Sequence, residues 1–285
     1  MTVKREDYAP TGETAWCPGC GNFAIRDCVV DALVRLDLPP HRVVICTGIG
    51  QAPKLPHYIR VNTFNGLHGR EVAAATGVKL AADDLTVIVH AGDGGAYGEG
   101  GNHFLHAIRR NIDITLIVHD NKTYGLTKGQ ASPTSKEGLR TAIQPDGLSS
   151  RALDPLALAV SQECSFVAQG FAGRPDQLVG LMVEAIRNPG FSLLNVLQPC
   201  VTWDGVHTWR YYRQRCFDIP ADHDPTSSEA ALALIHGNDG RIPLGIVYRH
   251  QRPSYHERVL AHLPRPLRVL EPRPERAIDI VAKRL

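Results

Sequence analysis

Short apolar runs rich in β-branched residues alternate with segments of helical periodicity along this chain, and this alternation limits the possible folds more than any other feature. Strands are predicted over residues 42–46, 85–91, 113–120, 191–199 and 242–250. Helices are predicted over residues 21–36, 69–82, 101–111 and 174–188. Because parallel strands that are buried on both faces are almost continuously apolar, the pattern predicts an α/β fold with a doubly wound, mainly parallel sheet.

The length and composition allow one large domain with a sizeable core. The chain has 285 residues, of which 43% are hydrophobic. We expect one α/β domain over residues 1–213, followed by an irregular C-terminal extension over residues 214–285 that contacts another subunit or lies loosely on the surface. This expectation rests on an aromatic and basic segment that begins near residue 201 and on a final stretch rich in proline and arginine.

The charge balance argues against a polyanionic partner. Lysine and arginine number 31 against 29 acidic residues, so we expect neither nucleic acid nor an acidic membrane surface as a partner. No apolar run approaches the roughly 20 residues that cross a bilayer, and the amino-terminal residues lack a signal-peptide pattern, which favours a cytoplasmic protein. Seven cysteines, an odd number in such a chain, favour metal ligation or burial over a disulfide framework.

A glycine-dense loop follows the run 85–91. Six glycines lie between Gly92 and Gly101, with Asp93 in the first turn, so backbone N–H groups can approach phosphate oxygens there. Asn121 follows the next predicted strand, 28 positions after Asp93. The Asp93 carboxylate, the Asn121 amide oxygen and the Thr123 carbonyl oxygen would together suit Mg²⁺, which completes its octahedron with diphosphate oxygens and water.

The segment "WCPGCGN", residues 16–22, places Cys17 and Cys20 two residues apart. Such a pair can form a redox disulfide, half of a zinc site or half of an iron–sulfur site. A zinc ribbon requires a second close pair of ligands about 15–20 residues later, and none occurs. A thioredoxin-like protein would have a strand before the pair, and none is predicted over residues 1–16. Metal ligation of another kind remains the favoured interpretation.

Several motifs taken in order resemble the β subunit of the 2-oxoacid:ferredoxin oxidoreductases. They are "WCPGCGN", "GIGQAPKLPHY", "NGLHGREVAAATGVKLA", the stretch from "GDGGAYGEGG" to "HDNKTYGLTKGQASPTS", and "VLQPCVTW". The resemblance implies the diphosphate-binding domain of thiamine-diphosphate enzymes. It also implies oxidative decarboxylation of a 2-oxoacid with coenzyme A to an acyl-CoA and CO₂, or the reverse reductive carboxylation, with electrons passing through a cluster to ferredoxin. The implied cofactors are thiamine diphosphate, Mg²⁺ and one [4Fe-4S] cluster.

The resemblance assigns roles to individual residues. For thiamine diphosphate and Mg²⁺ it implies the ligands Asp93, Asn121 and Thr123, the diphosphate contacts Gly92, Gly94 and Gly95, and His68 as a lining residue. Cluster ligands would be Cys17, Cys20 and Cys200. Where the family has a further cysteine, directly after "GIG", this chain has Gln51. Either Cys46, five residues earlier, or a group other than cysteine therefore completes the ligand set, unless one iron is left open.

The resemblance also implies a partner, because thiamine enzymes bind the aminopyrimidine on a second domain. We expect an α subunit that supplies the activating glutamate and the coenzyme A contacts, in an (αβ)₂ assembly. Lys54 and Lys128 follow predicted strand ends and are candidates for binding a substrate carboxylate, which favours 2-oxoglutarate and the product succinyl-CoA. Alternatives are the pyruvate- or branched-chain 2-oxoacid-specific enzyme of the same family, and a thiamine-dependent decarboxylase component without a cluster.

Overall fold

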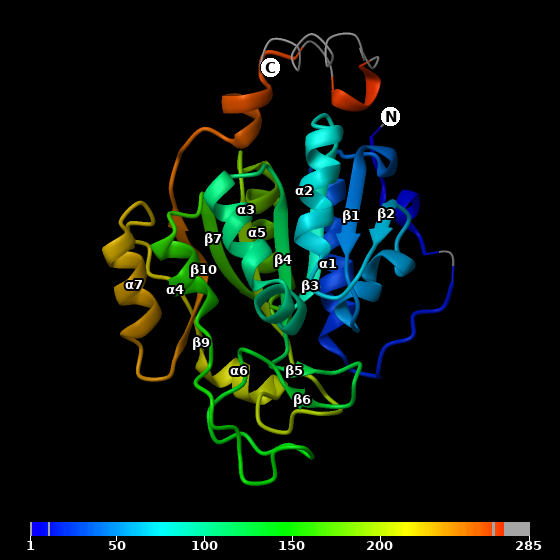
Figure 1. Ribbon diagram of the computed structural model, residues 1–285. Coiled ribbons are helices and arrows are strands. Elements are labelled where there is room, and N and C mark those ends of the chain that lie inside the picture. Colours follow the sequence, from blue (N-terminus) through cyan, green and yellow to red (C-terminus); the bar gives the residue numbers. More distant parts are fainter. Residues whose placement is uncertain (1, 11, 264–265, 271–285) are drawn as a thin grey trace, which may run out of the picture.

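Eight strands form one mixed sheet between two layers of helices in this computed structural model, which describes residues 2–10, 12–263 and 266–270 (Figure 1). The strand order is β2-β1-β3-β4-β8-β7-β10-β9. The strands are β1 (Val43–Thr47), β2 (Asn62–Asn65), β3 (Thr86–Gly92), β4 (Thr115–Asp120), β7 (Phe166–Phe171), β8 (Ser192–Leu197), β9 (Cys216–Asp218) and β10 (Ile242–Arg249). Every pairing in the sheet is parallel except that of β10 with β7. The predicted doubly wound, mainly parallel sheet is confirmed.

The helices cover both faces of the sheet. One face carries α1 (Gly21–Arg35) and α5 (Pro175–Arg187), and the other carries α2 (Glu71–Ala81), α3 (Gly101–Arg110), α4 (Pro155–Ser161) and α7 (Ser228–His236). Alternate residues of β1 enter the two cores: Ile45 packs in the core with α1 and α5, whereas Cys46 packs in the core with α2 and α3. This alternation follows from the period of two in a strand and decides which site each residue can reach.

Shorter elements complete the chain. They are α6 (Trp209–Arg215), the hairpin strands β5 (Thr123–Tyr124) and β6 (Gln130–Ala131), and the helical turns η1 (Arg5–Tyr8), η2 (Pro40–Arg42), η3 (Ala52–Tyr58), η4 (Gly94–Glu99), η5 (His256–Leu260) and η6 (Leu267–Val269). Figure 1 shows β5, β6 and α6 gathered at the carboxyl ends of the parallel strands, at the lower end of the view. Ligands of doubly wound sheets bind at this end.

The segment after residue 213 is more regular than expected. It contributes β9, α7 and β10, and β10 pairs with β7 so that Ile246 lies opposite Ala168. The expected irregular extension therefore takes part in the main sheet as far as Arg249. Residues 264–265 and 271–285 of the expected extension lie outside the described residues. None of the helices in the described ranges has the length and hydropathy of a bilayer-spanning segment.

Candidate cofactor and cluster sites

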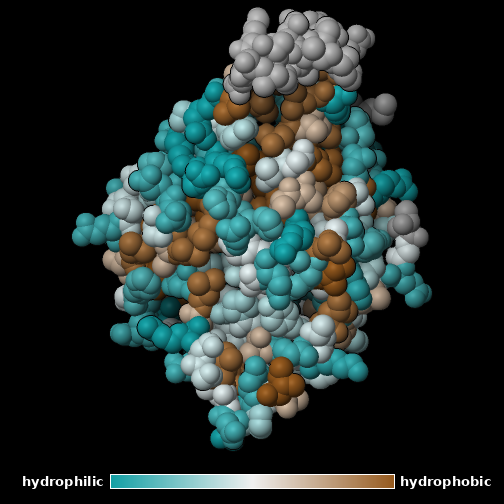
Figure 2. Space-filling model, in the orientation of Figure 1, coloured by the Kyte–Doolittle hydropathy of each residue, from teal (hydrophilic) through white to brown (hydrophobic). Residues whose placement is uncertain are grey.

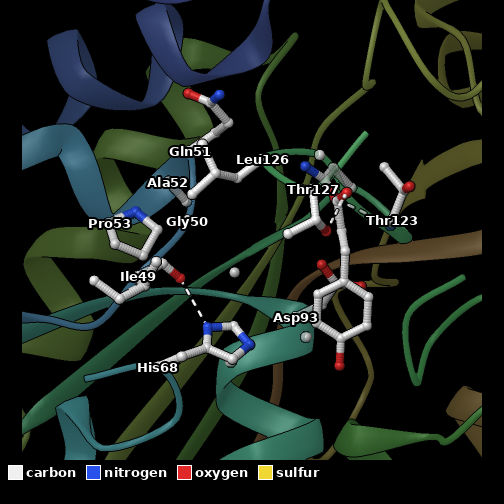
Figure 3. A pocket seen from close by; sticks show the side chains of 16 residues that line it. Ile49, Gly50, Gln51, Ala52, Pro53, His68, Asp93, Thr123, Leu126 and Thr127 are labelled. Atoms are coloured by element: carbon white, nitrogen blue, oxygen red, sulfur yellow. Dashed lines mark hydrogen bonds between the residues drawn. The ribbon is translucent and has the colours of Figure 1, made fainter. Parts of the chain in front are cut away.

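A cavity of about 300 Å³ opens at the carboxyl ends of β1, β3 and β4 (Figure 3). Figure 3 shows Ile49, Pro53 and His68 on one side of it and Asp93 and Thr123 on the other. The cavity brings together all seven residues named from the sequence for thiamine diphosphate and Mg²⁺: His68, Gly92, Asp93, Gly94, Gly95, Asn121 and Thr123. Residues from distant parts of the sequence thus line one space because three parallel strands end side by side.

Gly94 and Gly95 begin η4, and both lie in close contact with side chains. A Cβ atom at Gly94 would lie 2.2 Å from Cε1 of Tyr124, and one at Gly95 would lie 2.7 Å from Oε1 of Glu71. The loop backbone therefore runs close between these two side chains while facing the cavity. This is the kind of exposed glycine backbone that can present N–H groups to phosphate oxygens.

Asp93 is a buried carboxylate that lies near a second buried carboxylate, Asp120, at this end of the sheet. It accepts hydrogen bonds from Ser132 Oγ, at 2.5 Å, and from Thr134 Oγ1, at 2.7 Å. Asp120, at the end of β4, accepts from the same Thr134 Oγ1 at 2.9 Å and is paired with Lys122 Nζ at 3.1 Å. Burial and the charge of Asp120 raise the pKa of Asp93 to about 6, against the effect of the two hydroxyl donors. A cation next to Asp93 would relieve this repulsion.

Asn121 and Thr123 form a tight turn after β4. Lys122 between them has a positive φ of 58°, and the Thr123 N–H donates to Asn121 Oδ1 at 3.1 Å. The Thr123 hydroxyl donates to the Gln130 carbonyl at 3.0 Å, which fixes the turn to the β5–β6 hairpin. Both residues therefore face the cavity on a rigid turn.

These residues fit Mg²⁺ only if another molecule contributes ligands. Within the described ranges, no group of three or more His, Cys, Asp or Glu side chains could hold a metal ion. Asp93 is the single carboxylate of the expected set, and Mg²⁺ is commonly bound by one or two carboxylates together with phosphate oxygens and water. The donor set thus suits Mg²⁺ that arrives with a diphosphate.

His68 is held at the cavity by two polar neighbours. Its Nδ1 donates to the Ile49 carbonyl oxygen at 2.8 Å, and its Nε2 lies 3.0 Å from Glu99 Oε2, with which it forms an ion pair when the ring is protonated on both nitrogens. The hydroxyl of Tyr124 donates to the same Glu99 oxygen at 3.1 Å. His68 is thereby oriented as a lining residue of the cavity.

The two lysine candidates do not line this cavity. Lys54 lies on η3 beside Pro53, and Lys128 is exposed, with a positive φ of 78°, beside Thr127. Pro53 and Thr127 do line the cavity, so the structure places both lysines next to its wall and not inside it. No ion pair of either side chain is formed with a described residue.

A second, smaller cavity, of about 50 Å³, brings three cysteines together. Its lining comprises Trp16, Cys17, Cys20, Asn22, Gln51, Asn121, Gly125, Cys200, Val201, Thr202 and Trp203. Cys17 and Cys20 form the ends of a turn in which the Cys20 N–H donates to the Cys17 carbonyl at 3.0 Å and Gly19 has a φ of 79°. In a Pro-Gly turn of this type, glycine supplies the positive φ.

The loop that carries Cys17 and Cys20 is fixed on two sides. The Trp16 indole donates to the Gln51 carbonyl at 2.9 Å, and the Trp209 indole donates to the Gly19 carbonyl at 3.2 Å. A Cβ at Gly21 would lie 2.8 Å from Cβ of Gln198, so glycine is needed for α1 to approach the segment that leads to Cys200. The three cysteines thus come from separate segments that are tied to each other.

The surroundings of Cys20 show that its sulfur lies near the other two. Burial raises the pKa of the Cys20 thiol to about 11; an N–H of Asn22 opposes this, while the charges of Cys200 and Cys17 add to it. Each thiolate of a [4Fe-4S] cluster binds a different iron, so the ligands need not meet at one point as they do around a single ion. Three neighbouring cysteines in one cavity therefore fit a cluster, although they do not form a single-ion site.

Cys46, proposed from the sequence as a possible fourth ligand, does not line the cysteine cavity. It is fully buried on β1 between Phe64 of β2 and Val89 of β3, in the core with α2 and α3. The loop with Cys17 and Cys20 leads into α1, which covers the opposite face of the sheet. Because strand residues alternate between faces, Cys46 is directed away from the other three cysteines.

Gln51, Asn121 and Gly125 line both cavities. These residues therefore form a shared wall between the site for the seven cofactor residues and the site for the three cysteines. Oε1 of Gln51 is buried and has no hydrogen-bond partner among the described residues.

A chain of buried polar groups starts at the cysteine cavity and runs into the core. Asn22 Oδ1 accepts from His119 Nδ1 at 2.8 Å, so His119 Nε2 must accept from His90 Nδ1, at 2.9 Å. Burial lowers the pKa of His90 to about 3 and lowers that of His119 well below its usual value. Both imidazoles are thus neutral, and their tautomers are fixed by the Asn22 carbonyl. Sequence reasoning did not find this chain, because it joins α1 to two strands about 70 and 100 residues away.

Two family models match the chain. The "Thiamine pyrophosphate enzyme, C-terminal TPP binding domain" matches residues 45–196, and the C-terminal part of the pyruvate ferredoxin oxidoreductase β subunit matches residues 200–262. The first match contains every residue named for the cofactor cavity, so this chain has a thiamine-diphosphate-binding domain. The second match contains Cys200 and the strands β9 and β10.

Known proteins agree with both matches. A "2-oxoacid:ferredoxin oxidoreductase subunit beta" from Saccharolobus solfataricus is 41% identical, over 86% of this chain and 85% of the relative. A "2-oxoglutarate synthase subunit KorB" from Methanocaldococcus jannaschii is 36% identical, over 90% of this chain and 94% of the relative. A solved structure of the 2-oxoglutarate:ferredoxin oxidoreductase from Magnetococcus marinus is also similar, and it contains bound 2-oxoglutarate, coenzyme A and succinyl-CoA. Its TM-score is 0.91 at 34% sequence identity, and the match covers 98% of this chain and 96% of that chain.

Proposed function

The chain belongs to the β subunits of the 2-oxoacid:ferredoxin oxidoreductases, and we propose that its physiological substrate is 2-oxoglutarate. With an α subunit it catalyses the CoA-dependent oxidative decarboxylation of 2-oxoglutarate to succinyl-CoA and CO₂, or the reverse reductive carboxylation. The observation that carries the proposal is the adjacency of the two cavities: seven cofactor residues and three cysteines lie on either side of one wall. Relatives named for 2-oxoglutarate support this choice of substrate.

The glycine loop and the turn after β4 would hold the cofactor. The backbone around Gly94 and Gly95 would receive the diphosphate, while Asp93, Asn121 and the Thr123 carbonyl would hold Mg²⁺. When bound, thiamine diphosphate supplies a nucleophilic carbon for the 2-oxo group and an electron sink for the pair left by CO₂. His68, fixed by Ile49 and Glu99, would orient what lies in the cavity.

The cysteine cavity would hold one [4Fe-4S] cluster that takes electrons away from the reaction and passes them to ferredoxin. Cys17, Cys20 and Cys200 are its ligands in this proposal, and the two tryptophan hydrogen bonds hold the loop that carries Cys17 and Cys20. Gln51, Asn121 and Gly125 of the shared wall would separate the cofactor from the cluster. The protein supplies the positions of the two groups, and the groups supply the redox chemistry.

An α subunit would close the cofactor cavity. Large apolar side chains are exposed near its mouth: Ile49 is 46% exposed, Leu126 is 40% and Leu67, directly before His68, is 74%. Figure 2 shows hydrophobic surface on this face of the molecule beside β1 and β2 and again near β5 and β6. Exposed apolar patches with polar surroundings mark protein interfaces. We infer that this rim contacts the α subunit, which supplies the activating glutamate and the coenzyme A contacts, in an (αβ)₂ assembly.

Lys54 and Lys128 would act in substrate recognition in that assembly. Both lie beside wall residues of the cavity, at the end of the sheet where ligands bind. A carboxylate that enters between the subunits would come within reach of these flexible ammonium groups. The distal carboxylate of 2-oxoglutarate is the group that distinguishes it from pyruvate.

One experiment tests the proposed function. The chain is purified anaerobically with its α subunit, and viologen reduction is followed with coenzyme A and 2-oxoglutarate, pyruvate or a branched-chain 2-oxoacid. We expect a brown protein with the highest kcat/KM for 2-oxoglutarate. Highest activity with another 2-oxoacid would overturn the substrate, and a colourless protein that still decarboxylates would favour the cluster-free alternative.

A further inference from the structure

We propose that Gln51 completes the iron–sulfur site, with its side-chain oxygen as the ligand of the fourth iron. The inference rests on the cluster of the proposed function and goes beyond it, because it assigns a role to the residue at which this chain departs from a four-cysteine site. It predicts a cluster in which three irons have thiolate ligands and one iron has an amide oxygen.

The position of Gln51 is the first argument. It lies in the turn between β1 and η3 and lines the cavity that contains Cys17, Cys20 and Cys200. Its backbone carbonyl accepts the hydrogen bond from Trp16, the residue before Cys17, so the turn and the cysteine loop are held together. Figure 3 shows the Gln51 side chain directed away from the cofactor cavity, toward the helix that carries the colour of α1.

The unused oxygen of Gln51 is the second argument. Oε1 is buried and accepts no hydrogen bond from any described residue, and an unsatisfied buried acceptor costs about 1–3 kcal/mol. In native structures a buried polar group without a protein partner is accounted for by an ion, a water molecule or a functional role. An iron on the cysteine side of the wall would supply the missing partner.

No other amide in the cavity offers a comparable oxygen among the described residues. Asn22 Oδ1 already accepts from His119. Asn121 Oδ1 accepts from the Thr123 N–H and is assigned to Mg²⁺ in the proposed function. Cys46, the remaining thiol candidate, lies on the opposite face of the sheet. Gln198 also has a buried amide without partners in the described part of the chain, but it does not line the cavity. Among the described residues that line the cavity, Gln51 thus carries the buried amide oxygen that is left without a partner.

An oxygen ligand makes the fourth iron the most weakly held. Iron–sulfur clusters are bound by soft thiolates, and a neutral amide oxygen is a harder and weaker donor. Oxidation by ferricyanide should therefore release this iron first: the [4Fe-4S]²⁺ cluster gives one electron to ferricyanide, loses Fe²⁺ and becomes [3Fe-4S]⁺. The three thiolates remain bound to the three irons that stay.

The test compares variants of the anaerobically purified αβ complex by iron content and electron paramagnetic resonance after limited ferricyanide oxidation. We expect the wild-type complex to lose about one iron in four and to show the three-iron signal. Gln51→Cys should keep all its iron under the same treatment. Gln51→Leu should contain about three irons per complex before any oxidant is added, as [3Fe-4S]⁰ formed by loss of Fe²⁺, and should give the three-iron signal once it is oxidised. Gln198→Leu, the matched control, should behave as the wild type does.

The outcomes separate this inference from the function on which it rests. If Gln51→Leu retains the full iron content as firmly as Gln51→Cys does, the inference is wrong while the proposed function stands. The inference is also wrong, and the proposed function still stands, if Gln198→Leu loses iron and Gln51→Leu does not. A wild-type complex without any cluster overturns both.

Mössbauer spectra of the ⁵⁷Fe-enriched wild type give an independent result, which is needed because Gln51→Leu can fail to fold. We expect one iron site to differ from the other three. Four equivalent thiolate-bound sites contradict the proposal.

Discussion

Asp93 and Asp120 accept hydrogen bonds from the same hydroxyl, Oγ1 of Thr134, at 2.7 and 2.9 Å. A hydroxyl carries one hydrogen, so it can donate to only one of these buried carboxylates at a time. Lys122 neutralises Asp120 from 3.1 Å, which leaves Asp93 as the carboxylate without a cation. The negative charge of Asp93 therefore stays uncompensated until a cation binds next to it from the cavity side.

Replacing Asp93 should make the cofactor-free protein more stable and weaken its binding of the cofactor. In Asp93→Asn we expect the free energy of unfolding of the cofactor-free protein at pH 7 to rise by about 1–3 kcal/mol, because the carboxylate repulsion is removed. Binding of Mg²⁺ and thiamine diphosphate, measured by titration calorimetry, should weaken by at least ~100-fold. The exposed Asp146→Asn should change neither quantity. Undiminished cofactor binding in Asp93→Asn would remove Asp93 from the proposed ligand set.

The cysteines should divide into two groups by iron content. Cys20→Ala and Cys200→Ala should lose most of the cluster, because both side chains line the cysteine cavity. Cys46→Ala should retain it, because Cys46 packs on the other face of the sheet. Iron and sulfide analysis with visible absorbance measures the difference. Loss of the cluster in Cys46→Ala would contradict the placement of this residue.

The buried His90 should make the protein sensitive to acid. Its pKa is about 3 in the folded protein and about 6.5 in an unfolded chain, so only the unfolded chain takes up the proton as the pH falls below about 6.5. Stability contributed by the neutral His90 is therefore present above this pH and decreases below it, with a slope that approaches ~1.4 kcal/mol per pH unit. The free energy of unfolding, measured with urea at several pH values, should decrease less per pH unit in His90→Leu than in the wild type. The exposed His41→Leu should keep the wild-type slope.

Subunit association should depend on the apolar rim of the cofactor cavity. Leu67→Asp introduces a charge at a side chain that is 74% exposed, and we expect the affinity for the α subunit to fall by about tenfold or more. Val259→Asp is the matched control, since Figure 1 places η5 at the opposite end of the sheet. Size-exclusion chromatography at decreasing concentration measures the difference. Equal effects of the two variants would mean that the rim is not the interface.

Substrate preference should depend on Lys128. In Lys128→Ala we expect the KM for 2-oxoglutarate to rise by about tenfold, because a charged hydrogen bond to the distal carboxylate contributes about 1.5–3 kcal/mol. The KM for pyruvate, which lacks that carboxylate, should change little. Lys54→Ala tests the second candidate in the same assay. Equal changes for both substrates would remove either lysine from this role.

The parts of the fold that depend on local pattern could be predicted from the sequence. The five apolar runs became β1, β3, β4, β8 and β10, because a nearly continuous run of apolar residues can be recognised from its own residues alone. β2 was missed because its four residues are all exposed, and β7 because Gln169 and Gly170 interrupt its apolar character. The strand topology that places β10 inside the main sheet was not readable from the composition of the C-terminal segment.

The parts of the candidate site that depend on local pattern could also be predicted from the sequence, whereas the parts that depend on distant contacts could not. Residues adjacent to strand ends, such as Asp93 and Asn121, could be placed at one sheet edge, since parallel strands end together. The shared Thr134 hydroxyl and the Asn22–His119–His90 chain depend on contacts between distant segments and gave no periodic signal. The side of the sheet that Cys46 faces was available from the alternation along β1.

The wall between the two cavities has a consequence for mutational studies of this protein. Gln51, Asn121 and Gly125 each border both sites, so a substitution at one of them changes two binding environments at once. Effects of paired substitutions across the wall will therefore be strongly non-additive, as they are for residues in contact. Variation at these three positions should be correlated within the family, and replacements that are harmless in a relative should fail here unless the facing residue is transferred with them.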